Sequence, residues 1–168
     1  MSATSGVRRV SVVFSLALII VGVLPVFFSA GGIRGDEKKS SDPWSNSQTL
    51  RPADLAGELA EKNGTPPTIV YVGFRTLFAG GHISGASFHG TASSEQGLVA
   101  MKQWADGLPR STNLVIYCGC CPLEKCPNVR PAFTALSGMG FRKLHVLILP
   151  SNLATDWAGK GYPVQTGM

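Results

Sequence analysis

The chain has 168 residues, which is enough for one domain of ordinary size and a short appendage. Its formal net charge is +5, but Arg8 and Arg9 lie in the appendage, so the rest of the chain has only a small positive excess. The other charges are scattered, without a basic run interleaved with aromatic residues. The composition therefore gives no support for nucleic-acid binding.

An uncharged, mostly apolar stretch over residues 10–28 follows Arg8 and Arg9 directly. A positive segment before such a stretch is typical of an export signal or of an N-terminal membrane anchor. Its length is at the border between the two, because about 18 or more apolar residues can span a bilayer. We predict a signal peptide or anchor over residues 1–31. The remaining chain is then expected to be exported, to the periplasm or another place outside the cytoplasm, with residues 10–30 as its anchor if they are retained.

Residues 32–49 are rich in Gly, Ser, Asp and Lys, which predicts a flexible polar linker before a globular domain over residues 50–168. Within that domain, short β-branched or apolar runs alternate with stretches of helical spacing. The alternation predicts an α/β fold with a mostly parallel sheet covered by helices on both faces. In chain order, we expect a helix over 51–61, a strand over 68–72, a turn at 80–86 leading into a short strand, a helix over 98–108, a strand over 113–117, a helix over 128–138, a strand over 144–149 and a short helix over 152–158.

All four cysteines lie within nine positions, directly after the apolar run that ends at Tyr117 and before the helix expected from Asn128, its predicted N-cap. They are Cys118, Cys120, Cys121 and Cys126. A thiol that faces a helix N-terminus loses its proton more readily, because the free amides there favour negative charge. The position of Cys118 therefore predicts a nucleophile.

Four sequence motifs, in this order, resemble those of the rhodanese-like (sulfurtransferase) family and together span about residues 50–164. They are the turn Gly81–Ala86, the strand and cysteine Val115–Cys118, the helix end, glycine and strand of Leu136–Leu147, and the closing Asp156–Val164. The resemblance implies a compact α/β domain with a sheet of about five mainly parallel strands flanked by helices on both faces.

The resemblance also implies that Cys118 carries sulfane sulfur as a persulfide. Gly119, Lys125 and Arg130 are the residues of the following loop expected to hold an anionic donor. The implied partners are a small sulfur donor and a thiol acceptor or reductant, with no cofactor, no nucleic acid, and membrane contact only through the N-terminal segment.

The chain departs from the family pattern in two places. Tyr71-Val72-Gly73 stands where the family usually has Asp-Val-Arg, which removes the charges normally supplied from there. Eleven residues separate Cys118 from Arg130, a longer loop than the family's, so the usual anion cradle is enlarged or rebuilt.

The three further thiols, Cys120, Cys121 and Cys126, leave several interpretations open. In the first, one of them pairs with Cys118 in a resting disulfide. In the second, one of them resolves a Cys118 persulfide, and in the third a structural disulfide ties the loop together. Four thiolates also suit zinc or copper(I) by ligand type, but the Cys-x-Cys-Cys-x4-Cys spacing lacks the two separated pairs usual for zinc, and we predict no metal site.

Two alternatives to a sulfurtransferase or thiol-redox protein follow from the same residues. The first is a catalytically silent rhodanese fold that serves as a binding module and has structural cysteines. The second is a phosphatase or arsenate reductase, because a longer loop admits a tetrahedral oxyanion. That chemistry requires a Cys-x5-Arg loop to bind the oxyanion, and neither Cys118 nor Cys126 has this spacing to Arg130.

Overall fold

The structure, a computed structural model, describes residues 42–168. The predicted signal or anchor, residues 1–31, and residues 32–41 of the predicted linker lie outside the described residues. Within 42–168, no helix is long and apolar enough to cross a membrane. The first described elements are the short 3-10 helix η1 (Asn46–Gln48) and strand β1 (Thr49–Leu50), so regular structure begins a few residues before the predicted boundary at residue 50.

The main sheet has five strands that all run parallel, in the order β1-β6-β5-β2-β4, which confirms the predicted architecture. Its other strands are β2 (Thr68–Tyr71), β4 (Ser87–Phe88), β5 (Leu114–Tyr117) and β6 (Leu144–Leu147). Every residue of β5 is buried, as expected for the middle of a parallel sheet, and Tyr117 at its end lies in register with Tyr71 of β2. A separate antiparallel pair joins β3 (His82–Ile83) to β7 (Val164–Gln165).

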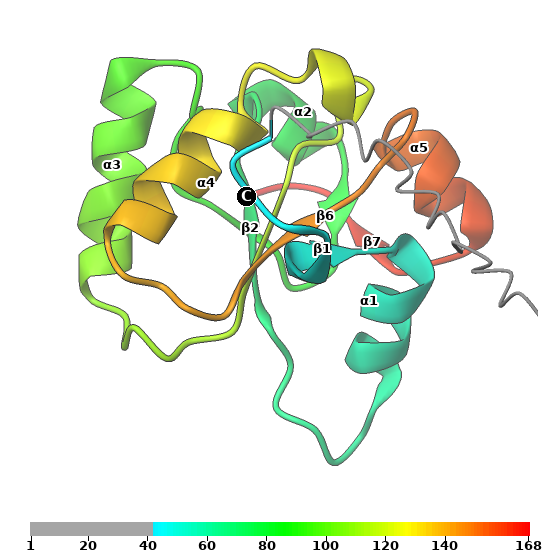
Figure 1. Ribbon diagram of the computed structural model, residues 1–168. Coiled ribbons are helices and arrows are strands. Elements are labelled where there is room, and N and C mark those ends of the chain that lie inside the picture. Colours follow the sequence, from blue (N-terminus) through cyan, green and yellow to red (C-terminus); the bar gives the residue numbers. More distant parts are fainter. Residues whose placement is uncertain (1–41) are drawn as a thin grey trace, which may run out of the picture. The chain divides into compact units, whose positions relative to one another are not determined.

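Helices cover both faces of the sheet (Figure 1). Strand residues alternate between the two faces, so Leu114 and Ile116 belong to one apolar cluster while Val115 and Tyr117 belong to the other. The first cluster is completed by α3 (Glu95–Asp106) and α4 (Val129–Gly138). The second is completed by α1 (Pro52–Ala60), α2 (Arg75–Gly80) and Trp157, which directly follows α5 (Leu153–Asp156). Two further 3-10 turns are η2 (Leu123–Lys125) and η3 (Ala158–Lys160).

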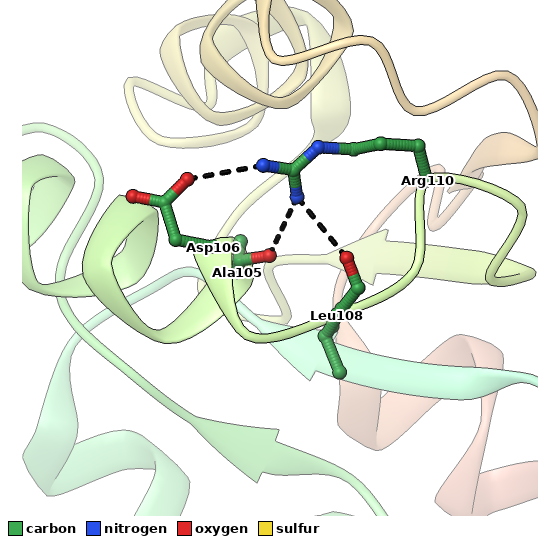
Figure 2. A network of polar contacts seen from close by, with 4 residues as sticks. All are labelled: Ala105, Asp106, Leu108 and Arg110. Atoms are coloured by element: carbon green, nitrogen blue, oxygen red, sulfur yellow. Dashed lines mark hydrogen bonds and ion pairs between the residues drawn. The ribbon is translucent and has the colours of Figure 1, made fainter.

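Arg110 ties the end of α3 to the segment that leads into β5 (Figure 2). Its Nη1 donates to the carbonyls of Ala105, at 2.8 Å, and Leu108, at 3.2 Å, while its Nη2 lies 3.1 Å from the carboxylate of Asp106. The last carbonyls of a helix lack the usual intrahelical donor, and the Ala105 carbonyl accepts both from this guanidinium and from the backbone N–H of Leu108, at 3.1 Å. The same guanidinium lies 4.8 Å from the ring centre of Phe141. These contacts fix the approach to the strand that ends next to Cys118.

Candidate active site

Cys118 is the first residue after β5, and its side chain is buried. The loop that follows passes through Cys120 and Cys121, turns at η2 and returns to Cys126 just before α4. All four cysteines lie in the described part of the chain and all four are free thiols. The structure therefore contains none of the loop disulfides that the sequence leaves open.

The thiols form a compact group although they come from both ends of the loop. The Sγ of Cys118 lies 3.2 Å from that of Cys120, which lies 3.2 Å from that of Cys121. The Sγ atoms of Cys118, Cys120 and Cys126 all lie within 4.8 Å of one another. The return path of the loop thus brings together sulfur atoms that are eight residues apart in the sequence.

Asn128 is fully buried and joins this group to the loop before α3. Its side-chain carbonyl accepts a hydrogen bond from the backbone N–H of Ser93, at 2.9 Å, and its amide nitrogen donates to the Sγ of Cys118, at 3.6 Å. The Ser93 N–H fixes the orientation of the carboxamide, because only the oxygen can accept it. Asn128 occupies the predicted N-cap position of α4, but its side chain makes no capping hydrogen bond. The two tertiary contacts use both ends of the carboxamide instead.

The first amides of α4 favour Cys126 rather than Cys118. Cys126 accepts hydrogen bonds from the thiol of Cys118 and from the backbone N–H groups of Asn128 and Val129, and together they lower the pKa of Cys126. The hydrogen bond to Cys126, together with burial, raises the pKa of Cys118. The sequence predicted the opposite for Cys118, since it placed that thiol at the helix N-terminus. In the structure the long loop places Cys126 there, and Cys118 remains the protonated partner.

The Tyr71-Val72-Gly73 segment brings the hydroxyl of Tyr71 close to Cys118. A Cβ on Gly73 would lie 2.5 Å from the Oη of Tyr71 and 2.8 Å from the Sγ of Cys118, so hydroxyl and thiol both approach the same side of this glycine. Tyr71 is 1% exposed, and its hydroxyl has no hydrogen-bond partner among residues 42–168. Burial raises the pKa of Tyr71, so its phenol stays protonated at neutral pH and can donate a hydrogen bond.

A cavity of about 490 Å³ lies beside this group. Its lining includes Tyr71, Gly119 and Cys120 from the site, together with Leu77 of α2 and Leu153 of α5, and no residue that lines it is charged. Cys120 therefore lines the cavity, and its sulfur lies 3.2 Å from that of Cys118. Leu153 packs closely on Gly119, where a Cβ would lie 2.5 Å from the Leu153 Cβ. A side chain at position 119 would displace α5 from the cavity wall.

The structure places the residues predicted to hold an anionic donor at three different locations. Gly119 lines the cavity, whereas Lys125 is exposed at the end of η2. Arg130 has its Nε 2.7 Å and its Nη2 2.6 Å from Oδ1 of Asp42, and its Nη1 donates to the carbonyl of Leu123, at 3.1 Å. Its guanidinium also lies 5.7 Å from the ring centre of Trp44. Arg130 thus ties the loop to the first described residues, and its predicted contact with a donor stays a prediction.

No protein-family model matches the chain, and no curated protein matches it. Solved structures do resemble it. The solution structure of a rhodanese-like domain from Anabaena is 23% identical with a TM-score of 0.51, over 71% of this chain and 79% of that one. A crystal structure of the same Anabaena protein is 24% identical with a TM-score of 0.52, over 71% and 93%. The domain has the rhodanese-like fold. A Bacillus halodurans protein shares it, with 19% identity and a TM-score of 0.56 over 71% and 77% of the two chains.

Two residues of this candidate site were not identified from the sequence as functional, Asn128 and Tyr71. The signal for Asn128 was weak, because an asparagine before a helix is usually explained by capping. The signal for Tyr71 was stronger. It replaces the first residue of the Asp-Val-Arg segment on the strand beside the cysteine strand, and the Gly73 that follows leaves room for its hydroxyl.

Proposed function

We propose that this domain is a sulfurtransferase that carries sulfane sulfur as a persulfide on Cys118. The observation that supports it best is the setting of one thiol. Cys118 lies at the end of the central strand of a rhodanese-like fold, with another thiol, a carboxamide and an unpaired phenol next to it. Buried side chains that only fill a core do not need such polar neighbours.

Loading begins with the Cys118–Cys126 pair. The Cys118 sulfur attacks the outer sulfur of a donor while its proton moves to the Cys126 thiolate, with which it is already hydrogen-bonded. A sulfur–sulfur bond forms at Cys118, the sulfur–sulfur bond of the donor breaks, and the leaving group departs with the electron pair. Cys120 lines the cavity and contacts Cys118, which does not line it, so we expect the Cys120 side chain to rotate aside and admit the donor.

Two neutral donors are placed to stabilise the charge on the loaded sulfur. The carboxamide of Asn128 already donates to the Cys118 sulfur, and the hydroxyl of Tyr71 lies near the same sulfur with no hydrogen-bond partner among residues 42–168. A preorganised donor in a site with little water favours charge that develops during the reaction. These groups take the place of the charged Asp and Arg that the family pattern usually supplies.

A thiol-redox outcome is the second function that the geometry favours, because Cys126 lies within 4.8 Å of Cys118. The Cys126 sulfur attacks the inner sulfur of the Cys118 persulfide, and the proton that Cys126 received during loading passes to the outer sulfur. A disulfide forms between the two residues, the bond to the outer sulfur breaks, and hydrosulfide leaves with the electron pair. A dithiol reductant must then reduce the disulfide before the next turnover.

The proposal extends to where the domain acts and with what. We place it outside the cytoplasm, delivered or anchored by residues 1–31, with a small sulfur donor and a thiol acceptor or reductant as its partners. The positively charged start and apolar stretch of the sequence support this location. Protease treatment of spheroplasts, in which the outer envelope is open and the cytoplasmic membrane is intact, tests it, because an exported domain is degraded there whereas a cytoplasmic one is degraded only after the cytoplasmic membrane is permeabilised.

The test of the sulfur carrier is mass spectrometry of the reduced full-length chain before and after treatment with thiosulfate or an organic polysulfide. A gain of one sulfur mass that fragment ions place on Cys118 is expected. Cys118→Ser should abolish the gain, while Cys121→Ser should keep it, because Cys121 contacts Cys120 rather than Cys118. A chain that gains neither sulfur nor a Cys118–Cys126 disulfide from either donor would exclude the carrier, and the domain would then be a binding module on this fold.

A further inference from the structure

The thiol group has a second property that sulfur transfer does not use. Sulfur transfer needs one carrier and one proton acceptor, yet the Sγ atoms of Cys118, Cys120 and Cys126 converge within 4.8 Å of one another. We propose that these three residues bind a single copper(I) ion as a three-thiolate site, a function beyond the proposed sulfur transfer.

The size of the group fits one ion. A metal–sulfur bond is about 2.3 Å long, so three sulfurs around one ion in a plane lie about 4 Å apart. The spacing between Cys118 and Cys120, 3.2 Å, and the limit of 4.8 Å for the whole group lie on either side of that value. Side-chain movements of less than about 1 Å therefore complete the coordination. An iron–sulfur cluster needs more widely separated cysteines, because several irons and sulfides lie between them.

The donor set favours copper(I). Soft thiolate ligands select copper(I) and zinc over hard cations. Zinc in structural sites is closed by four protein ligands, whereas the group found within residues 42–168 holds three sulfurs and no histidine or carboxylate. Cys121 lies 3.2 Å from Cys120 but does not belong to the group in which all sulfurs are mutually close. Three soft ligands therefore match copper(I) better than zinc.

The surroundings support charged sulfur ligands. The carboxamide of Asn128 donates to Cys118, and the backbone N–H groups of Asn128 and Val129 donate to Cys126. Such hydrogen bonds orient metal ligands and stabilise their negative charge. Cys118 and Cys126 are only 5% and 4% exposed, while Cys120 lines the cavity. The ion therefore has a route to two protected ligands past the third.

The loop is held in the conformation that this site needs. Arg130 donates to the carbonyl of Leu123 in η2 and pairs with Asp42, which fixes the turn that brings Cys126 back to Cys118. A ligand set that is already assembled loses less conformational freedom when the ion binds. Copper(I) and sulfane sulfur then compete for Cys118, so a copper-loaded chain is expected not to accept sulfur.

The test is an anaerobic titration of the reduced full-length chain with copper(I) in competition with bicinchoninate, a coloured copper(I) chelator. One equivalent is expected to bind. Cys118→Ser and Cys126→Ser should each weaken binding at least about 100-fold, because loss of a ligand should cost no less than loss of a group that only orients one. Cys121→Ser is the matched control and should stay within about 3-fold of the parent, because a serine hydroxyl can keep the hydrogen bonds of Cys121 to Cys120 and Cys126 without adding a soft ligand. Equal losses in Cys121→Ser and Cys118→Ser, or no copper taken from the chelator, would overturn the proposal.

X-ray absorption of the copper-loaded parent chain provides a second measurement that needs no variant to fold. Three sulfur neighbours around copper are expected, and two or four sulfurs would refute the three-thiolate site. The result is independent of sulfur transfer, because it requires no donor. Persulfide formation, in turn, is measured on the metal-free chain, so either proposal can fail while the other holds.

Discussion

The hydroxyl of Tyr71 offers a prediction in which stability and activity change in opposite directions. This oxygen is buried and has no hydrogen-bond partner within the described residues. A buried polar group without a partner costs about 1–3 kcal/mol. Tyr71→Phe removes only that oxygen and keeps the ring contacts with Phe78 and Tyr117, so it should raise the free energy of unfolding by about 1 kcal/mol. For a domain of this size, the melting temperature should rise by about 3–5 °C.

The same change should slow sulfur loading. A hydrogen bond to a charged group contributes about 1.5–3 kcal/mol, so loss of the donor to the Cys118 persulfide should reduce the loading rate about 10- to 100-fold. The assay follows the persulfide on Cys118 by rapid quench and mass spectrometry, and thermal unfolding by circular dichroism. Thiosulfate serves as the donor for all variants.

Tyr117→Phe is the matched control, because Tyr117 lies in register with Tyr71 on the neighbouring strand. The Tyr117 hydroxyl accepts a hydrogen bond from the N–H of the fully buried Ile83, at 2.9 Å. Its removal leaves that N–H unpaired and should destabilise the fold by about 1–3 kcal/mol, with little effect on loading. A Tyr71→Phe variant that loads at the parent rate, or that is less stable than the parent, would refute the assigned role.

Three further predictions test other parts of the site. Gly73→Ala should slow loading and destabilise the fold by about 1–3 kcal/mol in thermal unfolding, because its Cβ would fall 2.5 Å from the nearby phenol oxygen and 2.8 Å from the thiol. The lowered pKa of Cys126 predicts that ultraviolet absorbance shows one thiolate below the ordinary cysteine pKa of about 8.5. That thiolate should disappear as the pH falls and should be missing from Cys126→Ser, whereas an unchanged titration in that variant would contradict it. Arg130→Ala and Asp42→Asn should each cost about 1 kcal/mol and speed amide exchange across residues 119–126, since the ion pair between them is partly buried. Unchanged exchange in both would show that this pair does not hold the loop.

The sheet could be predicted from the sequence because its signals are local. Continuous apolar runs give β5 and β6, and their alternation with helical stretches predicts parallel order. The ends of some elements differ from their predicted positions by a few residues. Helix α3, for example, was predicted to begin at Leu98 but begins at Glu95, after its N-cap Ser94. A capping side chain extends a helix beyond its first apolar position, and the predicted boundary used only the apolar spacing.

The site was predicted less well because its contacts are long-range. Cys118 was found from its place after a strand, but which thiol receives the α4 amides depends on the path of an eleven-residue loop. Arg130 contacts Asp42, which lies 88 residues earlier, and no local pattern indicates that pair. Asn128 likewise makes its hydrogen bonds with Ser93 and Cys118 instead of capping its own helix.

The two departures from the family pattern are linked by the way charge is handled at Cys118. Without the Asp and Arg of the family's Asp-Val-Arg segment, the thiol is surrounded by a carboxamide, a phenol and other thiols. Neutral donors stabilise a thiolate less than a guanidinium does, so in the proposed function a second group takes the Cys118 proton, and the long loop supplies it as Cys126. On this proposal, the longer loop takes over the part of the missing charges.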